Sequence, residues 1–518
     1  MQLDVSDIIG AFGPYHAIVL CVTVLRALPS AWTLTGLDFL SGDVDFVCGY
    51  NSAIIIPGHT MRHHVVGSCG RHPPVQAPNG TYIEDTTQWQ PCPKFIFNSE
   101  PNGWSVVPEW DLVCERRWMS SAVQSIVFGG SFLGAILFGL FADWQGRRRS
   151  LMVSTVAFAA FAMLSAAFNS LWLFNTFRFG QAAAVAGIQI TSASLFMELL
   201  LPRDRYLLNV GFTVSFAIFT ILIPFVAYQL NSWRLFQFIT GLCALGIIPP
   251  LFVVEESPRW LISQKRTLEA REVLNSIFMT NKRKLSEFTY VMSNLVERTH
   301  KTESEGILRL LSHGHLRAQL LLILLYWLVE NGIYYAEIFL SAHIEYTDKV
   351  TAFTVGAAAE IPAGLVGMIF IRLLNRRSSM AGSLAVGSAC AIVTAFIPIH
   401  DSTYSLVLSA LTRFFLTLAT SIKWVYTLEL LPTNIRSLGF ASAFAMGRIG
   451  GIFAPFIRDL AFRSADNQKW CFAIIGGGSL VATVLIFFLP ETLNAQLPDS
   501  FFESYRRTRR RSQSLTAS

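Results

Sequence analysis

Charged residues are scarce in this chain. Asp, Glu, Lys and Arg make up 14% of its 518 residues, whereas 52% are hydrophobic and the mean hydropathy is +0.46. Soluble globular domains carry about 25% charged residues. This shortage excludes a soluble globule of average composition. Together with long apolar runs, it indicates an integral membrane protein.

Several sequence signatures of enzymes are also absent. The chain has no G-x-x-x-x-G-K-[ST] phosphate-binding loop, no G-x-S-x-G nucleophile turn and no H-E-x-x-H helix. We therefore expect that it is not an enzyme, binds no cofactor and does not use ATP directly. His59, His63, His64 and His72 lie near Cys69, but no C-x-x-C pair completes a tetrahedral set, so we expect a solvated loop and no metal.

Twelve apolar runs are long enough to cross a bilayer as α-helices. The predicted fold is therefore all-α and membrane-embedded. The first run follows Asp4 and Asp7, without a basic region or a convincing cleavage site, so we expect a retained anchor. The predicted spans are 11–33, 119–141, 150–170, 173–200, 207–229, 234–254, 317–340, 350–374, 379–400, 403–430, 437–461 and 469–489.

Basic residues gather in the loops on one side of these spans. Lys and Arg in short loops mark the cytoplasmic side, so we expect a multi-pass plasma-membrane protein with both termini in the cytoplasm. The net charge of +6 is then topological, and we expect no nucleic-acid partner because no aromatic-interleaved basic groove accompanies it. The basic residues on this side are Arg147, Arg148, Arg149, Arg203, Arg205, Arg372, Arg376, Arg377, Arg436, Arg506, Arg507, Arg509, Arg510 and Arg511.

A long loop at 34–118 is predicted to lie outside the cell, where disulfides persist. Two bridges are expected in it, and the spacing does not select among the three possible pairings. Asn79 begins an Asn-Gly-Thr acceptor sequence for N-glycosylation in the same loop. The four cysteines of the loop are Cys48, Cys69, Cys92 and Cys114.

The chain echoes itself at an offset of about 230 residues. Glu198 and Arg205 end one span as Glu429 and Arg436 end another, with the same gap between acid and base. Such an offset predicts two parallel six-span halves with a solute site between them. The predicted parts are a first half at 1–261, a cytoplasmic linker at 262–316 that is either helical or solvated, a second half at 317–490 and a basic tail at 491–518.

The eleventh predicted span contains a cation near its middle. Arg448 lies about 16 Å along this span, close to the centre of a ~30 Å hydrocarbon core, where an unpaired charge is costly. We therefore expect Arg448 to face a cavity and to meet an anionic solute group. The alternative partner is a protein acid such as Glu330 or Glu360. Small residues that allow close approach surround it: Gly447, Gly450 and Gly451.

Polar and aromatic residues of neighbouring spans are candidates for the same pocket. Lys423 would add positive potential to the cavity, or could snorkel to the cytoplasmic surface. Glu330 and Glu337 lie near one helix face, and with Glu360 they could pair these bases, relay a proton or hold the ammonium end of a zwitterion. The aromatic candidates, which could equally be packing residues, are Trp327, Tyr334, Tyr335, Trp424 and Tyr426.

The turn after the second span resembles a known signature. It reads Gly139-Leu-Phe-Ala-Asp143-Trp-Gln-Gly146-Arg147-Arg148 and is similar to the G-x-x-x-D-x-x-G-R-R loop of the major facilitator superfamily. The resemblance implies two pseudo-symmetric six-helix halves and a cytoplasmic latch between them that stabilises the outward-open form. The gating residues that we expect are Asp143, Arg147, Arg148, Glu198, Arg205, Glu256, Arg259, Glu429 and Arg436.

Nearly the whole chain resembles the organic ion transporters of that superfamily, the carriers of organic cations, carnitine and organic anions. The resemblance implies transport of a small organic ion across the bilayer, with a counter-ion or proton as a possible partner; it leaves the oligomeric state open. The stretches that carry it are Glu109-Trp-Asp-Leu-Val-Cys114, Glu256-Ser-Pro-Arg259-Trp and Tyr426-Thr-Leu-Glu429-Leu-Leu-Pro432-Thr-Asn-Ile-Arg436.

The same resemblance suggests the solute. Cation carriers of the group have an acid before Leu-Gly-Gly-Ile, whereas anion and carnitine carriers have arginine, as in Arg448-Ile-Gly-Gly-Ile here. The leading hypothesis is alternating-access transport, secondary-active or facilitative, of organic anions or zwitterions, with organic cations as the alternative. Gly364 stands where anion carriers have lysine. This departure motivates a second hypothesis, a transport-deficient receptor or scaffold.

Overall fold

The structure is a computed structural model, and it contains twelve helices long and apolar enough to cross a membrane among its described residues. This confirms the predicted fold class and the number of spans. Asn79 and the tail beyond residue 493 lie outside the described residues. The described residues are 9–10, 12–36, 46–48, 69–71, 74–76, 82–84, 90–92, 94–97, 105–230, 232–281, 314–341, 348–397, 402–431, 436–461 and 465–493.

The first span of the first half is broken in its middle. Pro29 has no backbone N–H, and in a continuous helix its ring would clash with the carbonyl of Leu25. Helix α2 therefore ends at Leu25, and Arg26 separates it from α3. The segments of this half are α2 (Pro14–Leu25), α3 (Ala27–Leu34), α5 (Val106–Glu109), a 3-10 turn (Cys114–Arg116), α6 (Arg117–Gln145), α7 (Arg147–Ala167), α8 (Leu171–Leu199), a 3-10 turn (Pro202–Leu207), a π-helical turn (Val210–Val214), α9 (Ser215–Leu230), α10 (Trp233–Ala244), a 3-10 turn (Leu245–Ile247) and α11 (Ile248–Leu251).

The second half is more regular. Each of its spans is one continuous helix, although Pro362 and Pro455 lie inside two of them. The helices of this half are α16 (Gly314–Ser341), α17 (Lys349–Leu373), α18 (Arg376–Phe396), α19 (Ser402–Leu430), α20 (Arg436–Ala461) and α21 (Ala465–Phe487).

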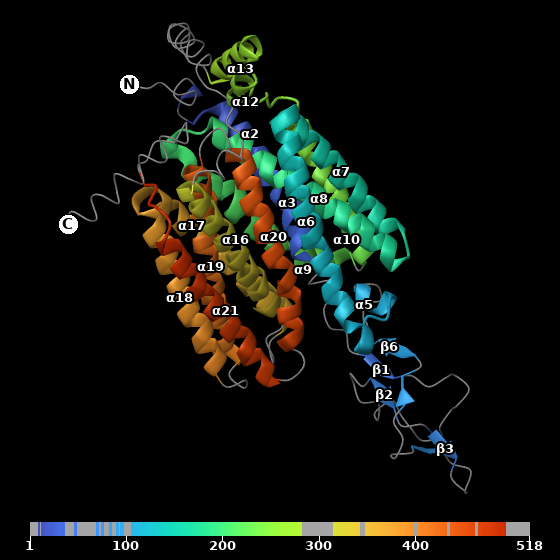
Figure 1. Cartoon of the computed structure of the whole chain (residues 1–518). Coiled ribbons are helices and arrows are strands. Elements are labelled where there is room, and N and C mark those ends of the chain that lie inside the picture. Colours follow the sequence, from blue (N-terminus) through green and yellow to red (C-terminus); the bar gives the residue numbers. More distant parts are fainter. Residues whose placement is uncertain are drawn as a thin grey trace, which may run out of the picture.

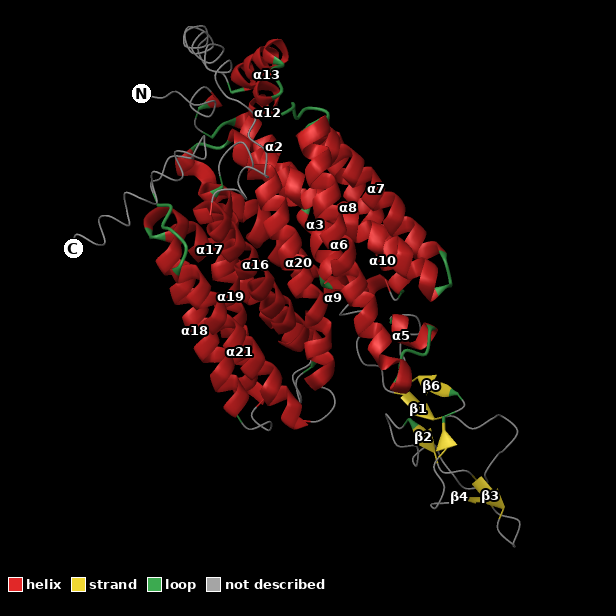
Figure 2. Ribbon diagram, in the orientation of Figure 1, coloured by secondary structure: helices red, strands yellow, loops and turns green. Residues whose placement is uncertain are grey.

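Two short helices follow the sixth span, α12 (Pro258–Ser263) and α13 (Thr267–Thr280). Helix α13 lies in the predicted linker and buries one stripe, with Ala270 and Leu274 facing the protein. Figure 2 shows α12 and α13 at one end of the bundle and the strands at the other. We call these the α13 end, which we predict to be cytoplasmic, and the strand end, which we predict to be external.

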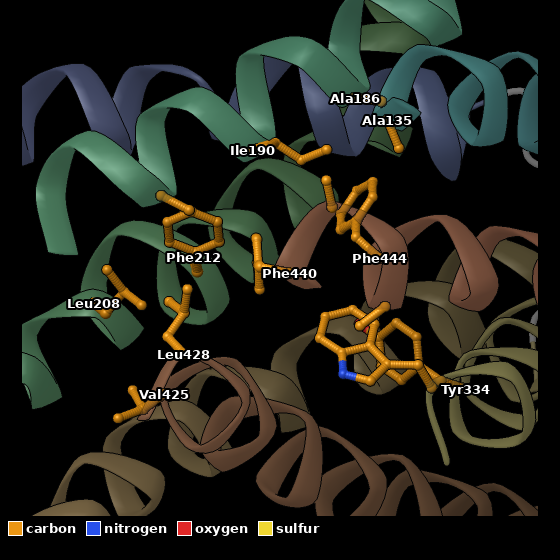
Figure 3. Close-up of a cluster of buried hydrophobic side chains, with 14 of the residues drawn as sticks. Ala135, Ala186, Ile190, Leu208, Phe212, Tyr334, Val425, Leu428, Phe440 and Phe444 are labelled. Carbon is orange, nitrogen blue, oxygen red and sulfur yellow. The ribbon is translucent and has the colours of Figure 1, made fainter. Parts of the chain in front are cut away.

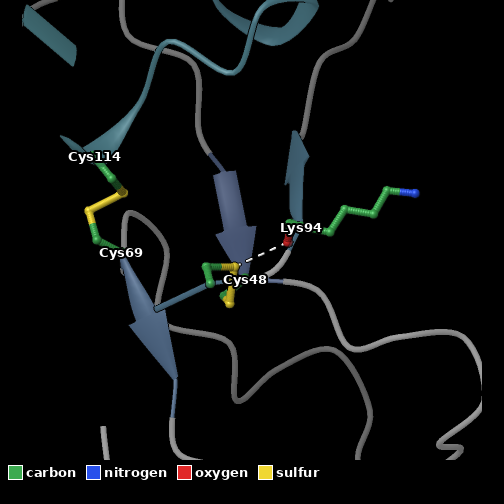
Figure 4. The surroundings of a disulfide bond; sticks show 5 residues. Cys48, Cys69, Lys94 and Cys114 are labelled. Carbon is green, nitrogen blue, oxygen red and sulfur yellow. Dashed lines mark hydrogen bonds between the residues drawn. A yellow bond between two sulfur atoms is a disulfide. The ribbon is translucent and has the colours of Figure 1, made fainter. Parts of the chain in front are cut away.

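The strand end carries three short antiparallel pairs. Strand β1 (Phe46–Cys48) pairs with β6 (Phe95–Phe97), β2 (Gly70–Arg71) with β5 (Gln90–Pro91), and β3 (Pro74–Gln76) with β4 (Tyr82–Glu84). Both expected bridges are present, as Cys48–Cys92 and Cys69–Cys114 (Figure 4). Because Cys114 begins the turn that leads into α6, the second bridge ties this loop to the second span.

Exposed aromatic side chains stand near both ends of the bundle. Trp144 lies near the α13 end, and Trp172 and Trp470 lie near the strand end. Tyr and Trp collect where a membrane meets water, because their rings are apolar and the indole N–H and phenol are polar. Exposed aromatic side chains near both ends are therefore what we expect of a bundle that crosses a bilayer.

The two halves meet along α6 with α20 (Figure 1), and they also meet along α9 with α17. Small residues allow the first contact: a Cβ on Gly139 would lie 2.9 Å from the Cβ of Ala441. A Cβ on Gly451 would lie 2.5 Å from the ring of Phe128. Helices α6 and α20 therefore touch closely at two well-separated points along their length.

A buried apolar cluster continues across this contact. Figure 3 shows Ile190 and Phe212 of the first half near Leu428, Phe440 and Phe444 of the second. Because the same cluster includes residues of both halves, apolar packing helps to hold them together in this arrangement. Buried polar groups interrupt this packing near the middle of the bundle.

Candidate functional site

A cavity lies between the two halves, near the middle of the helices that line it. Both halves contribute to its walls. Its volume of about 50 Å³ is room for a few water molecules, and it is far smaller than the ~300–1,000 Å³ of typical ligand pockets. Its charged lining residues are Arg26, Glu360, Lys423 and Arg448.

Arg448 of α20 is buried and lines the cavity. Its Nη1 donates a hydrogen bond to the Tyr335 hydroxyl at 2.7 Å, and its Nη2 donates to Oε1 of Gln189 at 2.8 Å. The ring centre of Phe444 lies 4.3 Å from the guanidinium carbon. All three partners are neutral. Gln189 belongs to the first half, so Arg448 contacts both halves.

No carboxylate of the described residues lies within ion-pair distance of Arg448. The two acids that we considered as its partners are engaged elsewhere, Glu330 by Lys423 and Glu360 by Arg413. The structure therefore does not support the alternative in which a protein acid neutralises Arg448.

Glycines position Arg448 by bringing α20 against α16. A Cβ on Gly450 would lie 2.0 Å from the backbone oxygen of Leu328, and a Cβ on Gly447 would lie 2.6 Å from the side chain of Asn331. Real Cβ atoms do not approach backbone this closely, so larger residues would push the helices apart. The glycine-rich sequence around Arg448 thus serves helix packing in this arrangement.

Arg26 is a lining residue that the sequence analysis missed. It stands between α2 and α3 and is buried, with its guanidinium carbon 3.5 Å from the ring centre of Phe212. Its Nη2 donates to the backbone oxygen of Gly211 at 3.0 Å, and its Nε has no hydrogen-bond partner. Among the described residues, no carboxylate lies within ion-pair distance of it. The signal in the sequence was a single arginine in the middle of the first apolar run.

The π-helical turn beside Arg26 also contacts the second half. A Cβ on Gly211 would lie 2.6 Å from Thr23, so this glycine allows the first span to approach the turn. A Cβ on Gly364 of α17 would lie 2.8 Å from Val214. The position where we noted the loss of a lysine is therefore filled by the opposite half.

Lys423 forms an ion pair with Glu330, and both side chains are buried. The Lys423 Nζ lies 4.3 Å from the ring centre of Trp327. Glu330 also accepts hydrogen bonds from the Thr420 hydroxyl and from Asn331. Lys423 therefore lines the cavity and does not snorkel, while Glu330 lies behind it and is not part of the lining.

Glu360 is the acid of the lining, and it is paired as well. Its Oε1 accepts from Arg413 at 2.8 Å and from the Tyr334 hydroxyl at 3.1 Å, whereas its Oε2 is buried without a hydrogen-bond partner. Glu337 lies outside the lining and accepts from Ser409 at 2.6 Å. Of the three acids that we singled out, Glu360 alone lines the cavity.

Aromatic rings form much of the remaining wall. Tyr334 and Tyr335 line it as expected, and so does Trp424, whose ring centre lies 4.7 Å from that of Phe212. Trp327 does not line it. Its indole donates to Thr427 at 3.0 Å, and its ring is covered by its neighbours. Trp327 is therefore a packing residue in this arrangement.

A cluster of charges joins the helix ends of the first half at the α13 end. Glu256 accepts from the backbone N–H groups of Arg147 and Arg148, at 2.7 and 3.2 Å from its Oε1, which caps the start of α7. Burial raises the pKa of the Glu256 carboxyl, and these N–H groups oppose the rise. Arg147 pairs with Asp143 at 2.9 Å and with Glu198 at 3.2 Å.

The second half repeats this arrangement, as the echo in the sequence predicts. Glu491 accepts from the backbone N–H groups of Arg376 at 2.9 Å and of Arg377 at 3.0 Å, which caps the start of α18. Arg376 lies 3.5 Å from Glu429, as Arg147 lies near Glu198 in the first half. The same capping chemistry thus holds both halves at this end.

An ion pair crosses between the halves at the α13 end, from Arg205 to Glu429 at 3.3 Å. The bonds from Arg147 to Asp143 and Glu198 lie within the first half, where Arg259 also donates to the backbone oxygen of Glu198 at 3.0 Å. Arg436 begins α20, but its side chain lies outside the described residues.

Other contacts cross between the halves at the strand end. Arg458 of α20 donates to the Ser121 hydroxyl of α6 at 2.9 Å, and the Ser125 hydroxyl donates to the backbone oxygen of Ile452 at 2.8 Å. The central cavity therefore lies between two sets of contacts, one toward each end of the bundle.

Known proteins resemble this chain in sequence over most of its length. The sequence matches the model of the family described as Sugar (and other) transporter over residues 74–499. It is 30% identical to solute carrier family 22 member 15 of Xenopus tropicalis over 408 residues, which cover 76% of this chain and 74% of the relative. It is 25% identical to the organic cation transporter protein of Drosophila melanogaster, over 96% of this chain and 93% of the relative.

Solved structures resemble the fold at lower identity. The proton:xylose symporter XylE bound to 6-bromo-6-deoxy-D-glucose has a TM-score of 0.66 and 15% identity, covering 93% of this chain and 98% of that one. The human organic anion transporter MFSD10 has a TM-score of 0.56 and 13% identity, covering 92% and 100%. At these identities the likeness concerns the major facilitator fold alone.

Proposed function

The chain belongs to the sugar (and other) transporter family, and from this premise we propose that it carries a small organic anion, or a zwitterion with an anionic end, across the plasma membrane. The carrier is secondary-active or facilitative, with both termini in the cytoplasm. The observation that supports the anionic solute is Arg448, a buried cation on the cavity wall whose hydrogen-bond partners are neutral.

The charges of the lining favour an anion over a cation. Three of the four charged lining residues are basic, and the acid, Glu360, is already paired with Arg413. A guanidinium can hold a carboxylate or sulfate through two parallel hydrogen bonds. A buried cation without a counter-charge is costly, so a bound anion would offset part of that cost. A bound cation would add to it.

Glu360 is the residue that could bind the ammonium end of a zwitterion. Its Oε2 is buried without a hydrogen-bond partner, on a residue that lines the cavity. An ammonium or hydroxyl of the solute could donate to this oxygen while the anionic end binds Arg448. Because Arg413 already compensates the carboxylate charge, this contact is weaker support than the one at Arg448.

Transport requires that the cavity open to one side at a time. In the arrangement described here the cavity is too small for an organic solute, and contacts cross between the halves toward both ends. Parting Arg205 from Glu429 would open the α13 end, and parting Arg458 from Ser121 would open the strand end. Solute binding shifts the populations of these forms by its different affinity for each.

The test is uptake by cells that express the protein, with labelled organic anions, organic cations and carnitine as a zwitterion. We expect saturable uptake of anions or carnitine, and Arg448→Gln should lower it by about thirtyfold or more, because removing a buried charged contact costs ~2–5 kcal/mol. Surface protein is measured in parallel, and Arg448→Lys shows whether charge alone suffices.

Two results would count against the proposal. Saturable uptake of cations that survives Arg448→Gln would favour a cation carrier. The absence of any uptake despite good surface expression would contradict transport for this panel and favour the receptor hypothesis, which ligand-dependent endocytosis without flux would then support.

A further inference from the structure

Two buried arginines face one cavity from opposite halves. Arg26 comes from the broken first span, and Arg448 comes from α20. At a rise of 1.5 Å per residue, each lies about 18 Å from the α13 end of its helix. Both therefore lie near the middle of a predicted membrane span, where an unpaired charge costs most.

Both arginines are held by neutral groups. Arg26 donates to the backbone oxygen of Gly211 and lies over the ring of Phe212, and Arg448 donates to Tyr335 and Gln189. These contacts fix the direction of each guanidinium without cancelling its charge. The two positive charges repel one another across the cavity.

A third buried arginine shows that the lack of a carboxylate is not sufficient for a ligand site. Arg178 of α8 is fully buried, and among the described residues no acid forms an ion pair with it. Its Nη2 donates to the backbone oxygen of Thr33 at 3.1 Å and its Nη1 to Gln181 at 3.3 Å. It does not line the central cavity. Arg178 serves helix packing, whereas Arg26 differs from it by its place on the cavity wall.

We propose that Arg26 is a second anion-binding residue of this cavity, so that the preferred solute carries two anionic groups, one held by Arg448 and the other by Arg26. This inference rests on the proposed function, which places an organic anion in the cavity. A dianion matches the charge of the two arginines of the lining, neither of which has a counter-charge among the described residues. A monoanion leaves one of them uncompensated.

Such a solute would also tie the two halves together. Arg26 belongs to the first half and Arg448 to the second, so one molecule bound to both would favour the form in which the halves are in contact. A solute with one anionic group can bind one arginine and leaves the repulsion across the cavity partly in place. Binding of one solute to both arginines would thus explain both the selectivity for a second charge and the closure of the cavity.

The test compares solutes that differ in one charge. Uptake is measured for straight-chain dicarboxylates from succinate to sebacate and for their monomethyl esters, at neutral pH, in cells that express the full chain. The series of lengths samples the separation of the two arginines. We define the charge preference as the uptake ratio of each dicarboxylate to its monoester.

We expect a charge preference above one for at least one length in the wild type. Arg26→Gln should lower that preference about tenfold or more, because it removes charged hydrogen bonds to the second group only. Arg448→Gln should lower uptake of both solutes. Arg178→Gln is the matched control, since it removes a buried arginine outside the cavity. It should lower at most the amount of surface protein and leave the charge preference unchanged.

The inference can also be tested on the purified wild type, without a variant that has to fold. The dicarboxylate should raise the thermal unfolding temperature more than its monoester does. Two results would overturn the inference and leave the proposed function standing. In the first, the wild type carries or binds monoesters as well as dicarboxylates. In the second, Arg26→Gln reaches the cell surface and keeps the wild-type charge preference. If the wild type takes up and binds no anion at all, the proposed function fails and the inference fails with it.

Discussion

Two buried cations of α19 form ion pairs with carboxylates, whereas the buried cations of α20 and of the first span donate hydrogen bonds to neutral groups. All four are buried to a similar degree. The α19 cations are compensated inside the protein, in the pairs Lys423–Glu330 and Arg413–Glu360. The other two of the four, Arg448 and Arg26, form no ion pair among the described residues.

This difference separates charges that hold the structure from charges available to a solute. A buried ion pair can be nearly neutral for stability as a whole, but removing one partner leaves an uncompensated charge. A cation that already lacks a partner carries that cost in the unliganded protein. Neutralising it should therefore harm solute binding more than stability, and the reverse should hold for a paired cation.

The largest effect is expected from breaking a pair. Glu330→Gln leaves Lys423 buried without a counter-charge, and it should destabilise the protein by about 3–5 kcal/mol. The measurement is the thermal unfolding temperature of the purified protein and its amount at the cell surface. Glu272→Gln, on the exposed face of α13, is the matched control with no expected effect.

The double variant Lys423→Met with Glu330→Gln tests whether the charge left alone is the cause of the instability. It removes both charges together, so most of the stability lost in Glu330→Gln should return. If Glu330→Gln alone is as stable as the wild type, then Lys423 is not held by this pair and the distinction between the two classes of cation is wrong.

A smaller effect is expected at the pair that crosses between the halves. Arg205→Gln leaves Glu429, which still has Arg376 at 3.5 Å and the Thr492 hydroxyl at 2.9 Å. The loss should be about 1–3 kcal/mol and should favour opening at the α13 end. The free cysteines Cys21, Cys243, Cys390 and Cys471 are first replaced by alanine, and a new cysteine is introduced at Asn331. This cysteine should then react faster with a thiol reagent added from the α13 end. An unchanged reaction rate would argue against a gating role.

The smallest effect on stability is expected at Asp143, which is partly exposed and pairs with Arg147 one helical turn away. Exposed pairs of this kind contribute about 0.3–0.5 kcal/mol. Asp143→Asn should therefore reach the surface normally and lower the rate of transport, because Arg147 is less firmly oriented toward Glu198. Normal transport by a well-expressed variant would contradict the role of this motif in the transport cycle.

The sequence predicts the charge in the middle of α20 but not the state of the neighbouring charges. Arg448 is identifiable because a cation in the centre of an apolar run must face protein or water. The pairing of Lys423 with Glu330 is not predictable, since it depends on the rotation of α16 against α19. The same rotation places Trp327 behind Lys423 and away from the lining.

Arg26 illustrates the opposite case, a residue with a readable signal. A single arginine stands in an otherwise apolar run and is followed by Pro29, which breaks the helix at that point. The disulfide pairing, by contrast, has no signal in the spacing of the four cysteines. It follows from the way the strands align in the loop.

The central claim is that Arg448 serves the solute and not the fold, and thermal unfolding of purified Arg448→Gln tests it directly. We expect the variant without solute to be at least as stable as the wild type, because a buried uncompensated charge has been removed. We also expect no rise in its unfolding temperature when the transported anion is added. A strongly destabilised variant that is still stabilised by the anion would contradict it and would make Arg448 a structural residue.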